Sequence, residues 1–479
     1  MAALISMLST DLVNKIKEEA FLVLEKVGIF QEMEEAYDLL ADYGCVTDRK
    51  NHKFFAPRRI VERALESAPK EIKMFDRYGV EAAVLSGTNV HFDPGSAALN
   101  ILDYTTGEQR RPRLNELPEL ANLVSQLKNL ALQSTSMVPG DVPQEISDSI
   151  RLYAALKYSP KPVITGTFRK ESFKVMREML IAVRGGAEAL IEKPLAIFDC
   201  CPSPPLRWSD LTATAVVDCA KAGIPSEFVS MPLMGATGPV TFVGSLVQHC
   251  AEELSGVILA QAAKEGAPVI YGGSPSVFDM RNGTTPMGAI ETMMFDAAYA
   301  QIGRSFGLPT HAYMGLSDSR KVDYQGGFET GMGAVLAASA GINMVSGAGM
   351  MDFESCQSFE KLALDNEICG MALHLNKGIT PVSDNLGFEE LSEFAGTGDF
   401  LKSSLTRKYY RSQQYFPSEV VERSAGGMSA GSDANDRAHL RVEKLLSNAP
   451  DILNDDKALA IAKLMLTEAK LFGMNDLKI

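Results

Sequence analysis

The chain has 479 residues, of which 46% are hydrophobic and 22% charged, as is ordinary for a globular protein with a sizeable core. Its net charge of −14 argues against nucleic acid or an anionic membrane as partner, and no apolar run predicts a transmembrane helix. The N-terminal residues lack the pattern of a signal peptide, so we expect a cytoplasmic protein. The seven cysteines contain no C-x-x-C pair, and neither a disulfide framework nor a zinc ribbon is expected.

Residues 1–125 are predicted to form an extension of helices and β-hairpins. Residues 11–30 carry apolar side chains at helical spacing, and a second helix is expected to begin near Pro57. Residues 72–112 alternate in polarity and contain several glycine turn signals, which predicts antiparallel hairpins.

Residues 126–385 show a recurring strand-and-helix pattern. Short apolar runs, most of them led by proline or glycine, recur about every 30 to 45 residues with helical stretches between them. A strand, a helix and a return in that length is a βα unit with parallel strands, and continuously apolar strands are covered on both faces. We therefore predict a (β/α)8 TIM-type barrel, with residues 378–384 as a possible eighth strand. Residues 386–479 are expected to form helices packed on the barrel.

In such a barrel the active site lies at the carboxyl ends of the strands and in the loops that follow. The candidates at these positions are Gln133, Ser134, Thr135, Thr165, the segment 199–203, Glu227, Tyr271, His311, Tyr313, Asn343 and Ser346. The connection 313–330 is unusually charged for a link between two buried elements. It either faces the pocket or is an exposed loop whose acids cap the next helix.

Residues 307–378 resemble the trimethylamine methyltransferase superfamily. The motif residues are the segment 321–327 (KVDYQGG), the turn 345–349 (VSGAG) and the segment 364–367 (LDNE). The resemblance implies a barrel enzyme that moves a methyl group from an amine to the cobalt of a separate corrinoid protein. Relatives that act on trimethylamine carry pyrrolysine near Gly315 to Asp318, where this chain has Leu316 or a near neighbour. The resemblance is therefore to the non-pyrrolysine branch, whose members demethylate quaternary amines of the glycine betaine, proline betaine or carnitine type.

We assign roles on this basis. Asp323, Gln325 and His311 are the predicted catalytic residues, with Asp323 near the ammonium end and His311 or Gln325 near a carboxylate. The predicted substrate-binding residues are Glu227, Tyr271, Tyr313, Leu316, Arg320, Phe328, Glu329 and Asn343. The predicted cofactor is a corrinoid (cobalamin) carried by the partner protein, without a tightly bound metal. We expect a cationic or zwitterionic substrate, a homo-oligomer, and no nucleic-acid or membrane partner.

Two alternatives stay open from the sequence. One is a metal-dependent barrel methyltransferase or lyase that uses Cys200, Cys201 and His311. The other is a non-catalytic relative that binds a corrinoid protein.

Overall fold

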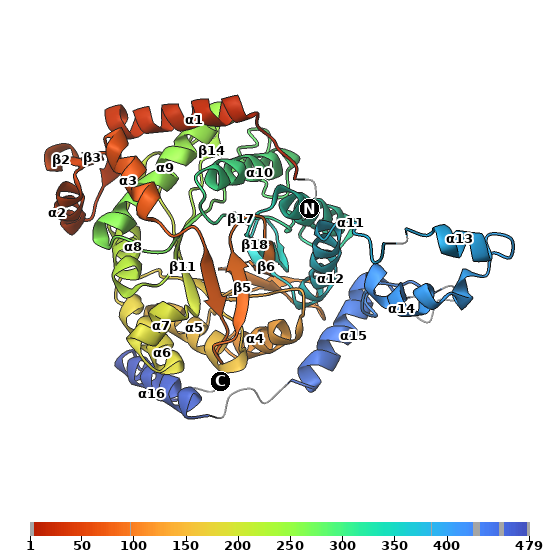
Figure 1. Ribbon diagram of the computed structural model, residues 1–479. Coiled ribbons are helices and arrows are strands. Elements are labelled where there is room, and N and C mark those ends of the chain that lie inside the picture. The colour runs from red at the N-terminus through yellow and green to blue at the C-terminus, as the bar shows by residue number, and fades with distance from the viewer. Residues whose placement is uncertain (1–3, 96, 385, 425–431, 450–454, 477–479) are drawn as a thin grey trace.

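The computed structural model describes residues 4–95, 97–384, 386–424, 432–449 and 455–476. It is an α/β fold in which parallel strands lie at the centre and helices surround them (Figure 1). No helix in these ranges is long and apolar enough to cross a membrane.

The central strands form two parallel sheets. Their orders are β15-β13-β11-β10-β9 and β17-β18-β6. The bounds are β6 His91–Pro94, β9 Gln133–Ser134, β10 Val163–Gly166, β11 Ala196–Cys200, β13 Ser226–Phe228, β15 Val269–Tyr271, β17 His311–Tyr313 and β18 Met344–Ala348. A parallel bridge from Tyr271 to Thr310 joins β15 to the start of β17. On the other side, Ala131 N–H donates to the Phe92 carbonyl at 2.8 Å, between β6 and β9.

Two strand predictions were wrong. Strand β6 lies in the stretch that we expected to form only hairpins, yet it pairs in parallel with β18. Residues 378–384 form no strand and are mostly exposed. Pro381 cannot donate a ladder hydrogen bond. The parallel pairing of β6 with β18 joins segments some 250 residues apart, and no local pattern reveals it.

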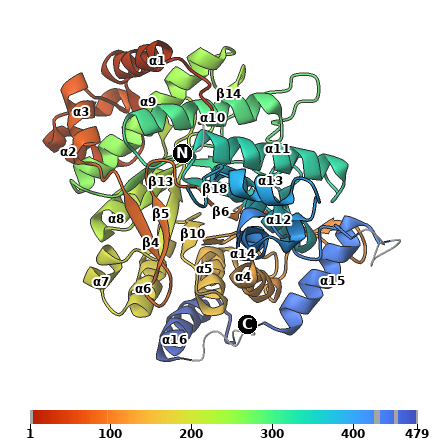
Figure 2. The ribbon, with the colours of Figure 1, turned by 45° about the vertical axis from the view of Figure 1, so that its right-hand side comes forward.

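Helices connect the successive central strands, as the predicted βα units require (Figure 2). They are α4 Glu116–Gln126, α5 Ser147–Tyr158, α6 Ser172–Arg184, α7 Ala187–Glu192, α8 Asp210–Ala222, α9 Phe242–Ala263, α10 Ile290–Ser305 and α11 Tyr324–Ala340. Helix α12 Phe359–Asn376 follows β18, the last of the central strands. Short strands sit in the loops at the carboxyl ends: β12 Arg207–Trp208, β14 Leu233–Met234, β16 Ser276–Val277, β19 Met350–Met351 and β20 Cys356–Gln357. Ser209, Thr241, Asp323 and Ser358 cap their helices by accepting a backbone N–H, as these residue types favour.

The N-terminal extension has the predicted helices. Its elements are α1 Thr10–Leu22, β1 Ile29–Gln31, α2 Glu34–Tyr43, β2 Val46–Asp48, β3 Lys53–Phe55, α3 Arg58–Ser67, β4 Ile72–Phe75, β5 Glu81–Leu85, β7 Asn100–Leu102 and β8 Gln109–Arg110. Antiparallel pairing of β4 with β5 and of β7 with β8 confirms two of the expected hairpins.

The C-terminal helices are α13 Phe388–Phe394, α14 Ser404–Gln413, α15 Ala434–Ser447 and α16 Asp456–Leu471. Helix α16 packs on α5 and α6, and α15 packs on α4 and α12. Helices α13 and α14 project away from the body (Figure 1).

One end of the central strands is closed by the β4–β5 hairpin. Ile72, Met74 and Leu85 of the hairpin pack against side chains that point inward from the strands. These are Leu132, Ile164, Ile197, Ile270 and Met344. We call this cluster the apolar plug. Because apolar side chains fill this end, polar side chains can gather only at the opposite, carboxyl ends of the strands.

Candidate functional site

The inner face of the strands changes from apolar to polar toward their carboxyl ends. Ile197 and Met344 belong to the apolar plug. Asp199 and Ser346 follow two positions later on the same strands and so face the same side. Carboxyl ends of parallel strands are where α/β proteins bind ligands.

We call the polar side chains on this inner face, at the carboxyl ends of the strands, the inner layer: Asp93, Asp199, Glu227, His311, Tyr313 and Ser346. A chain of polar contacts crosses the inner layer from β13 to β6. His311 Nδ1 lies 2.5 Å from Glu227 Oε1, although the angle falls outside hydrogen-bond geometry. His311 Nε2 lies 2.9 Å from Ser346 Oγ, and Ser346 Oγ donates to Asp93 Oδ2 at 2.8 Å. Four side chains from four strands are thereby linked.

Burial disfavours the charged form of each titratable member of this chain. It lowers the pKa of His311 to about 3 and raises the pKa of Glu227 well above its usual value. Burial also raises the pKa of Asp93. Because Ser346 gives its single proton to Asp93, His311 is assigned to donate from Nε2 and to face Glu227 with an accepting Nδ1.

Tyr313 and Asp199 extend the polar layer toward the opening. Tyr313 OH donates to Asp199 Oδ2 at 3.3 Å, and its ring meets the His311 ring edge-on at 4.8 Å. This confirms that His311 and Tyr313 share a face. Burial, followed by the charge of Glu227, raises the pKa of Asp199.

Several buried oxygens near these strand ends have no hydrogen-bond partner among the described residues. They include Asp93 Oδ1, Asp199 Oδ1, Glu227 Oε2, both carboxylate oxygens of Asp296 and Glu354 Oε1. Buried polar atoms are normally paired with protein or ordered water. A Cβ added at Gly272 would lie 2.5 Å from the Phe228 carbonyl oxygen and 3.2 Å from both Glu227 Cγ and His311 Nδ1, so glycine is needed at this closely packed position. The arrangement suits a polar or cationic occupant.

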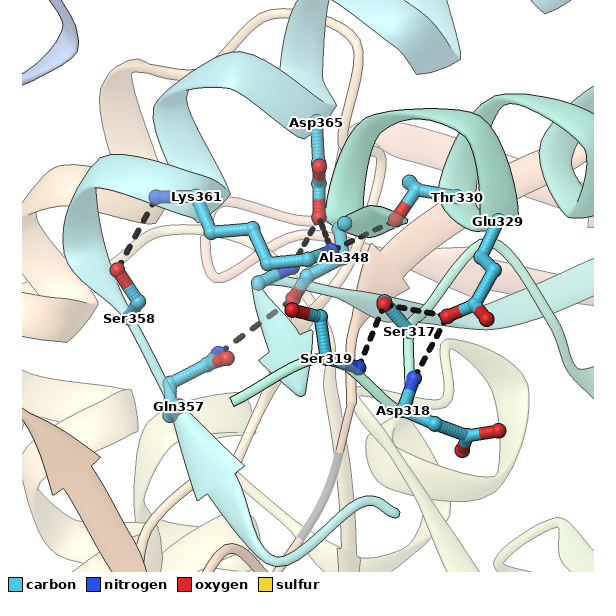
Figure 3. Close-up of polar contacts among 12 residues, drawn as sticks. Ser317, Asp318, Ser319, Glu329, Thr330, Ala348, Gln357, Ser358, Lys361 and Asp365 are labelled. Atoms are coloured by element: carbon cyan, nitrogen blue, oxygen red, sulfur yellow. Dashed lines mark hydrogen bonds and ion pairs between the residues drawn. The ribbon is translucent and has the colours of Figure 1, made fainter. Parts of the chain in front are cut away.

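The charged connection after β17 is organised around Glu329 of α11 (Figure 3). Glu329 Oε2 accepts from Ser317 Oγ at 2.6 Å and from Asp318 N–H at 2.9 Å. Asp318 in turn accepts the N–H groups of Met287 and Gly288, each at 2.9 Å. Most of this charge therefore holds loops together at the opening.

A second network fixes the turn after β18 (Figure 3). Buried Lys361 donates to Thr330 Oγ1 at 2.8 Å and to Asp365 Oδ2 at 2.6 Å. The same Asp365 oxygen accepts Gly349 N–H at 2.7 Å. Helices α11 and α12 are thereby tied to the end of β18.

Several predicted site residues lie on this rim, away from the inner layer. Asp323 is exposed and caps α11 by accepting Gly326 N–H at 3.0 Å. Gln325 donates to Glu329 Oε1 at 2.9 Å, and Arg320 pairs with Asp352 at 2.9 Å. Phe328 is 44% exposed.

Three other predicted residues are buried elsewhere. Tyr271 points outward from β15 to His249 and Tyr299 of the helical layer, with ring centroids 5.6 and 6.4 Å away. Asn343 lies before β18 and accepts Thr310 N–H at 2.9 Å, on the closed side. Leu316 is buried beside Gly347. Of the predicted set, the inner layer brings together His311, Glu227 and Tyr313.

Our prediction missed Asp93 of the inner layer and two acids that lie outside the central strands. Asp93 was missed because β6 was taken for a hairpin strand. Asp296 and Glu354 lie on α10 and in the loop after β18, where acids are common at the surface. No sequence signal marks these two as buried.

The cysteines do not join His311. Cys200 Sγ contacts the Phe198 carbonyl at 3.7 Å, whereas His311 contacts Glu227 and Ser346. Within the described ranges, no group of three or more His, Cys, Asp or Glu side chains is arranged to hold a metal ion.

Comparison with known proteins assigns the chain to a family. The profile described as trimethylamine methyltransferase (MTTB) matches residues 1–465. The chain belongs to the trimethylamine methyltransferase family. This confirms the resemblance found in the sequence, and residues 313–330 hold only standard amino acids.

Two curated members of the trimethylamine methyltransferase family align over most of the chain. Glycine betaine methyltransferase of Desulfitobacterium hafniense strain Y51 is 32% identical over 447 residues, covering 92% of each protein. Trimethylamine methyltransferase MttB of Methanosarcina barkeri strain Fusaro is 29% identical over 475 residues, covering 95% of this chain and 94% of the relative.

A solved structure shares the fold. The monomethylamine methyltransferase MtmB of Methanosarcina barkeri has a TM-score of 0.50 at 10% identity, covering 98% of this chain and 89% of that one. At this identity the similarity supports a shared fold and nothing further.

Proposed function

We propose that this family member moves a methyl group from a quaternary amine to the cobalt of a corrinoid carried by a partner protein. The observation that carries the proposal is the buried layer of carboxyl groups with unpartnered oxygens at the strand ends. We infer that the two parallel sheets close into a (β/α)8 barrel through the bridges on either side, with this layer at its open end.

The residues of the layer would bind and orient the ammonium group. A cation would favour the ionised form of these buried acids and would be attracted to the ring of Tyr313, and the apolar plug below excludes water. The corrinoid of the partner, when bound, would supply reduced cobalt as the acceptor of the methyl group. The amine leaves as a neutral molecule, so the chain need only hold the methyl group in line with the cobalt of the partner.

A surface beside the opening offers the partner a place to dock. An apolar groove of about 640 Å³ is lined by residues of α11, α12 and α15, including Phe328, Leu364 and Met371. Tyr324, at the start of α11, is 87% exposed. The cytoplasmic location and the homo-oligomer stay predictions.

The test is a panel of amines with the purified protein, the corrinoid partner or free reduced cobalamin, monitored by the visible spectrum of the corrinoid. Methylation from one or more quaternary amines supports the proposal. Absence of transfer from every quaternary amine, with active partner present, contradicts it.

A further inference from the structure

Between the end of α12 and Tyr415 the chain extends away from the body of the molecule. Tyr415 OH donates to Glu367 Oε2 of α12 at 2.9 Å, and Ser418 N–H donates to the same oxygen at 3.1 Å. The residues between α12 and these contacts, 377–384 and 386–414, include α13 and α14, and Figure 1 shows both helices away from the other elements. We call this segment the arm.

The arm exposes apolar side chains that a folded protein normally covers. Of its described residues, only Ser403 is buried. Leu386 is 83% exposed, Phe388 80% and Leu401 83%. The other large apolar side chains exposed on the arm include Ile379, Val382, Leu391 and Tyr410. Monomeric proteins seldom expose apolar side chains gathered in this way, and such patches mark sites of interaction.

Neither helix of the arm is long enough to be stable on its own. Helix α13 has 7 residues and α14 has 10, whereas isolated helices shorter than about 12 to 15 residues are marginal in water. Within the arm, the rings of Phe394 and Phe400 lie 5.8 Å apart. A hollow of about 420 Å³ is lined by residues that include Leu386, Leu405 and Tyr409. Burial of these apolar surfaces against another molecule would supply the stabilisation that the arm lacks.

The two helices of the arm carry opposite charges. Helix α13 contains three glutamates and no basic residue, and α14 contains three basic residues and no acid. Within each helix two like charges are four residues apart, a spacing at which they repel each other. These pairs are Glu389 with Glu393 and Arg407 with Arg411. In the described part of the arm the ion pair that forms lies outside both helices, so it neutralises none of these four charges.

We propose that the arm pairs with the arm of a second copy of this chain, with α13 of each copy against α14 of the other. A two-fold interface joins the same surface of both copies, so that surface must be complementary to itself. An acidic and a basic helix on one arm meet this condition, whereas a partner surface of a single sign would attract one helix and repel the other. The pairing also covers the exposed apolar side chains, and it does not depend on the proposed methyl transfer.

Sedimentation velocity of the full chain at micromolar concentration tests the pairing. The wild type should sediment as a dimer or as an even multiple of a dimer. The double variant Phe388→Ser with Leu401→Ser should weaken this association at least about tenfold, because both side chains would be buried between the arms. Since both are exposed in the single chain, the variant should keep the fold of the wild type, which circular dichroism checks.

Reversal of charge tests which helices meet. Glu389→Lys with Glu393→Lys makes α13 basic, and Lys408→Glu with Arg411→Glu makes α14 acidic. Each double variant alone should associate at least about tenfold more weakly than the wild type, because its two helices then carry the same sign. An equimolar mixture of the two variants should recover the association, because every helix of one variant then meets a helix of opposite charge on the other.

Helix α7 provides the matched control. Glu188→Lys with Glu192→Lys reverses two exposed charges four residues apart on the side of the molecule away from the arm (Figure 1), and this variant should associate like the wild type. A wild type that stays monomeric, arm variants that associate normally, or a mixture that does not recover would each overturn the proposal. A monomeric wild type that binds the corrinoid partner, and loses it in the Phe388→Ser and Leu401→Ser variant, would assign the arm to that partner instead.

Discussion

His311 and Glu227 approach within 2.5 Å while both are fully buried, and their pKa values move in opposite directions. Burial lowers the pKa of His311 to about 3 and raises that of Glu227. Below pH about 6.5, the histidine of the unfolded chain binds a proton that His311 does not bind in the folded state, so stability falls as the pH falls toward 3. Above pH about 4.3, the glutamate of the unfolded chain loses a proton that Glu227 keeps in the folded state, so stability falls as the pH rises. Between pH about 4.3 and pH about 6.5 the two contributions to the unfolding free energy change in opposite directions.

Glu227→Gln should remove only the glutamate effect. Relative to wild type, the variant should gain about 1.4 kcal/mol of unfolding free energy per pH unit above pH about 4.3, up to the folded pKa of Glu227. Urea denaturation at pH 5, 6, 7 and 8 measures the difference. A constant difference across this range would show that Glu227 is ionised in the folded protein.

Ser346→Ala should break the polar chain between His311 and Asp93. The hydroxyl contacts His311 Nε2 and donates to Asp93 Oδ2, so its loss leaves two buried groups without a partner. The expected cost is about 1–3 kcal/mol of unfolding free energy, with slower methyl transfer. Exposed Ser412 on α14 supplies the control, Ser412→Ala. Equal stability of the two variants would mean that the chain contributes nothing to the fold.

Asp318 and Asp323 should respond differently to replacement by alanine, although both lie on the connection after β17. Asp318 accepts two N–H groups from the loop after β16, and its loss should lower transfer efficiency about ten- to a hundredfold by loosening the opening. Asp323 caps an exposed helix end, and its loss should cost about 1 kcal/mol of stability with little change in transfer. Thermal melts of both variants measure the change in stability, and methyl-transfer rates measure the change in activity. A larger transfer defect in Asp323→Ala would support the catalytic role first assigned to Asp323.

The repeat of βα units and the shared face of His311 and Tyr313 could be predicted because both follow from local periodicity. The strand β6 could not, since its parallel partner β18 is distant in sequence. Tyr271 was misplaced because a three-residue strand gives no indication of which side chain faces inward. The sequence shows that the connection 313–330 is charged, but only the structure shows that Asp318 and Glu329 accept hydrogen bonds from neighbouring backbone N–H groups.

Methyl transfer should survive treatment with EDTA. The histidine that would have to bind a metal contacts Glu227 and Ser346 instead, and a quaternary amine needs no Lewis acid because it leaves neutral. Rates before and after chelation, with the corrinoid partner present, measure the effect. A loss that zinc restores would revive the metal-dependent alternative.

Trimethylamine should be a poor substrate beside a quaternary amine. Trimethylamine that gives up its N–H proton to solvent is a neutral amine, and losing a methyl group from it would require an amide anion to depart. A quaternary ion has no such proton to lose, so its leaving group stays neutral in the same pocket. Transfer to reduced cobalamin should therefore be at least about a hundredfold faster from the quaternary amine, a difference of about 2.7 kcal/mol in barrier. Equal rates, measured by the visible spectrum at several pH values, would show that the pocket supplies a proton and that its acids do not serve mainly to hold a permanent cation.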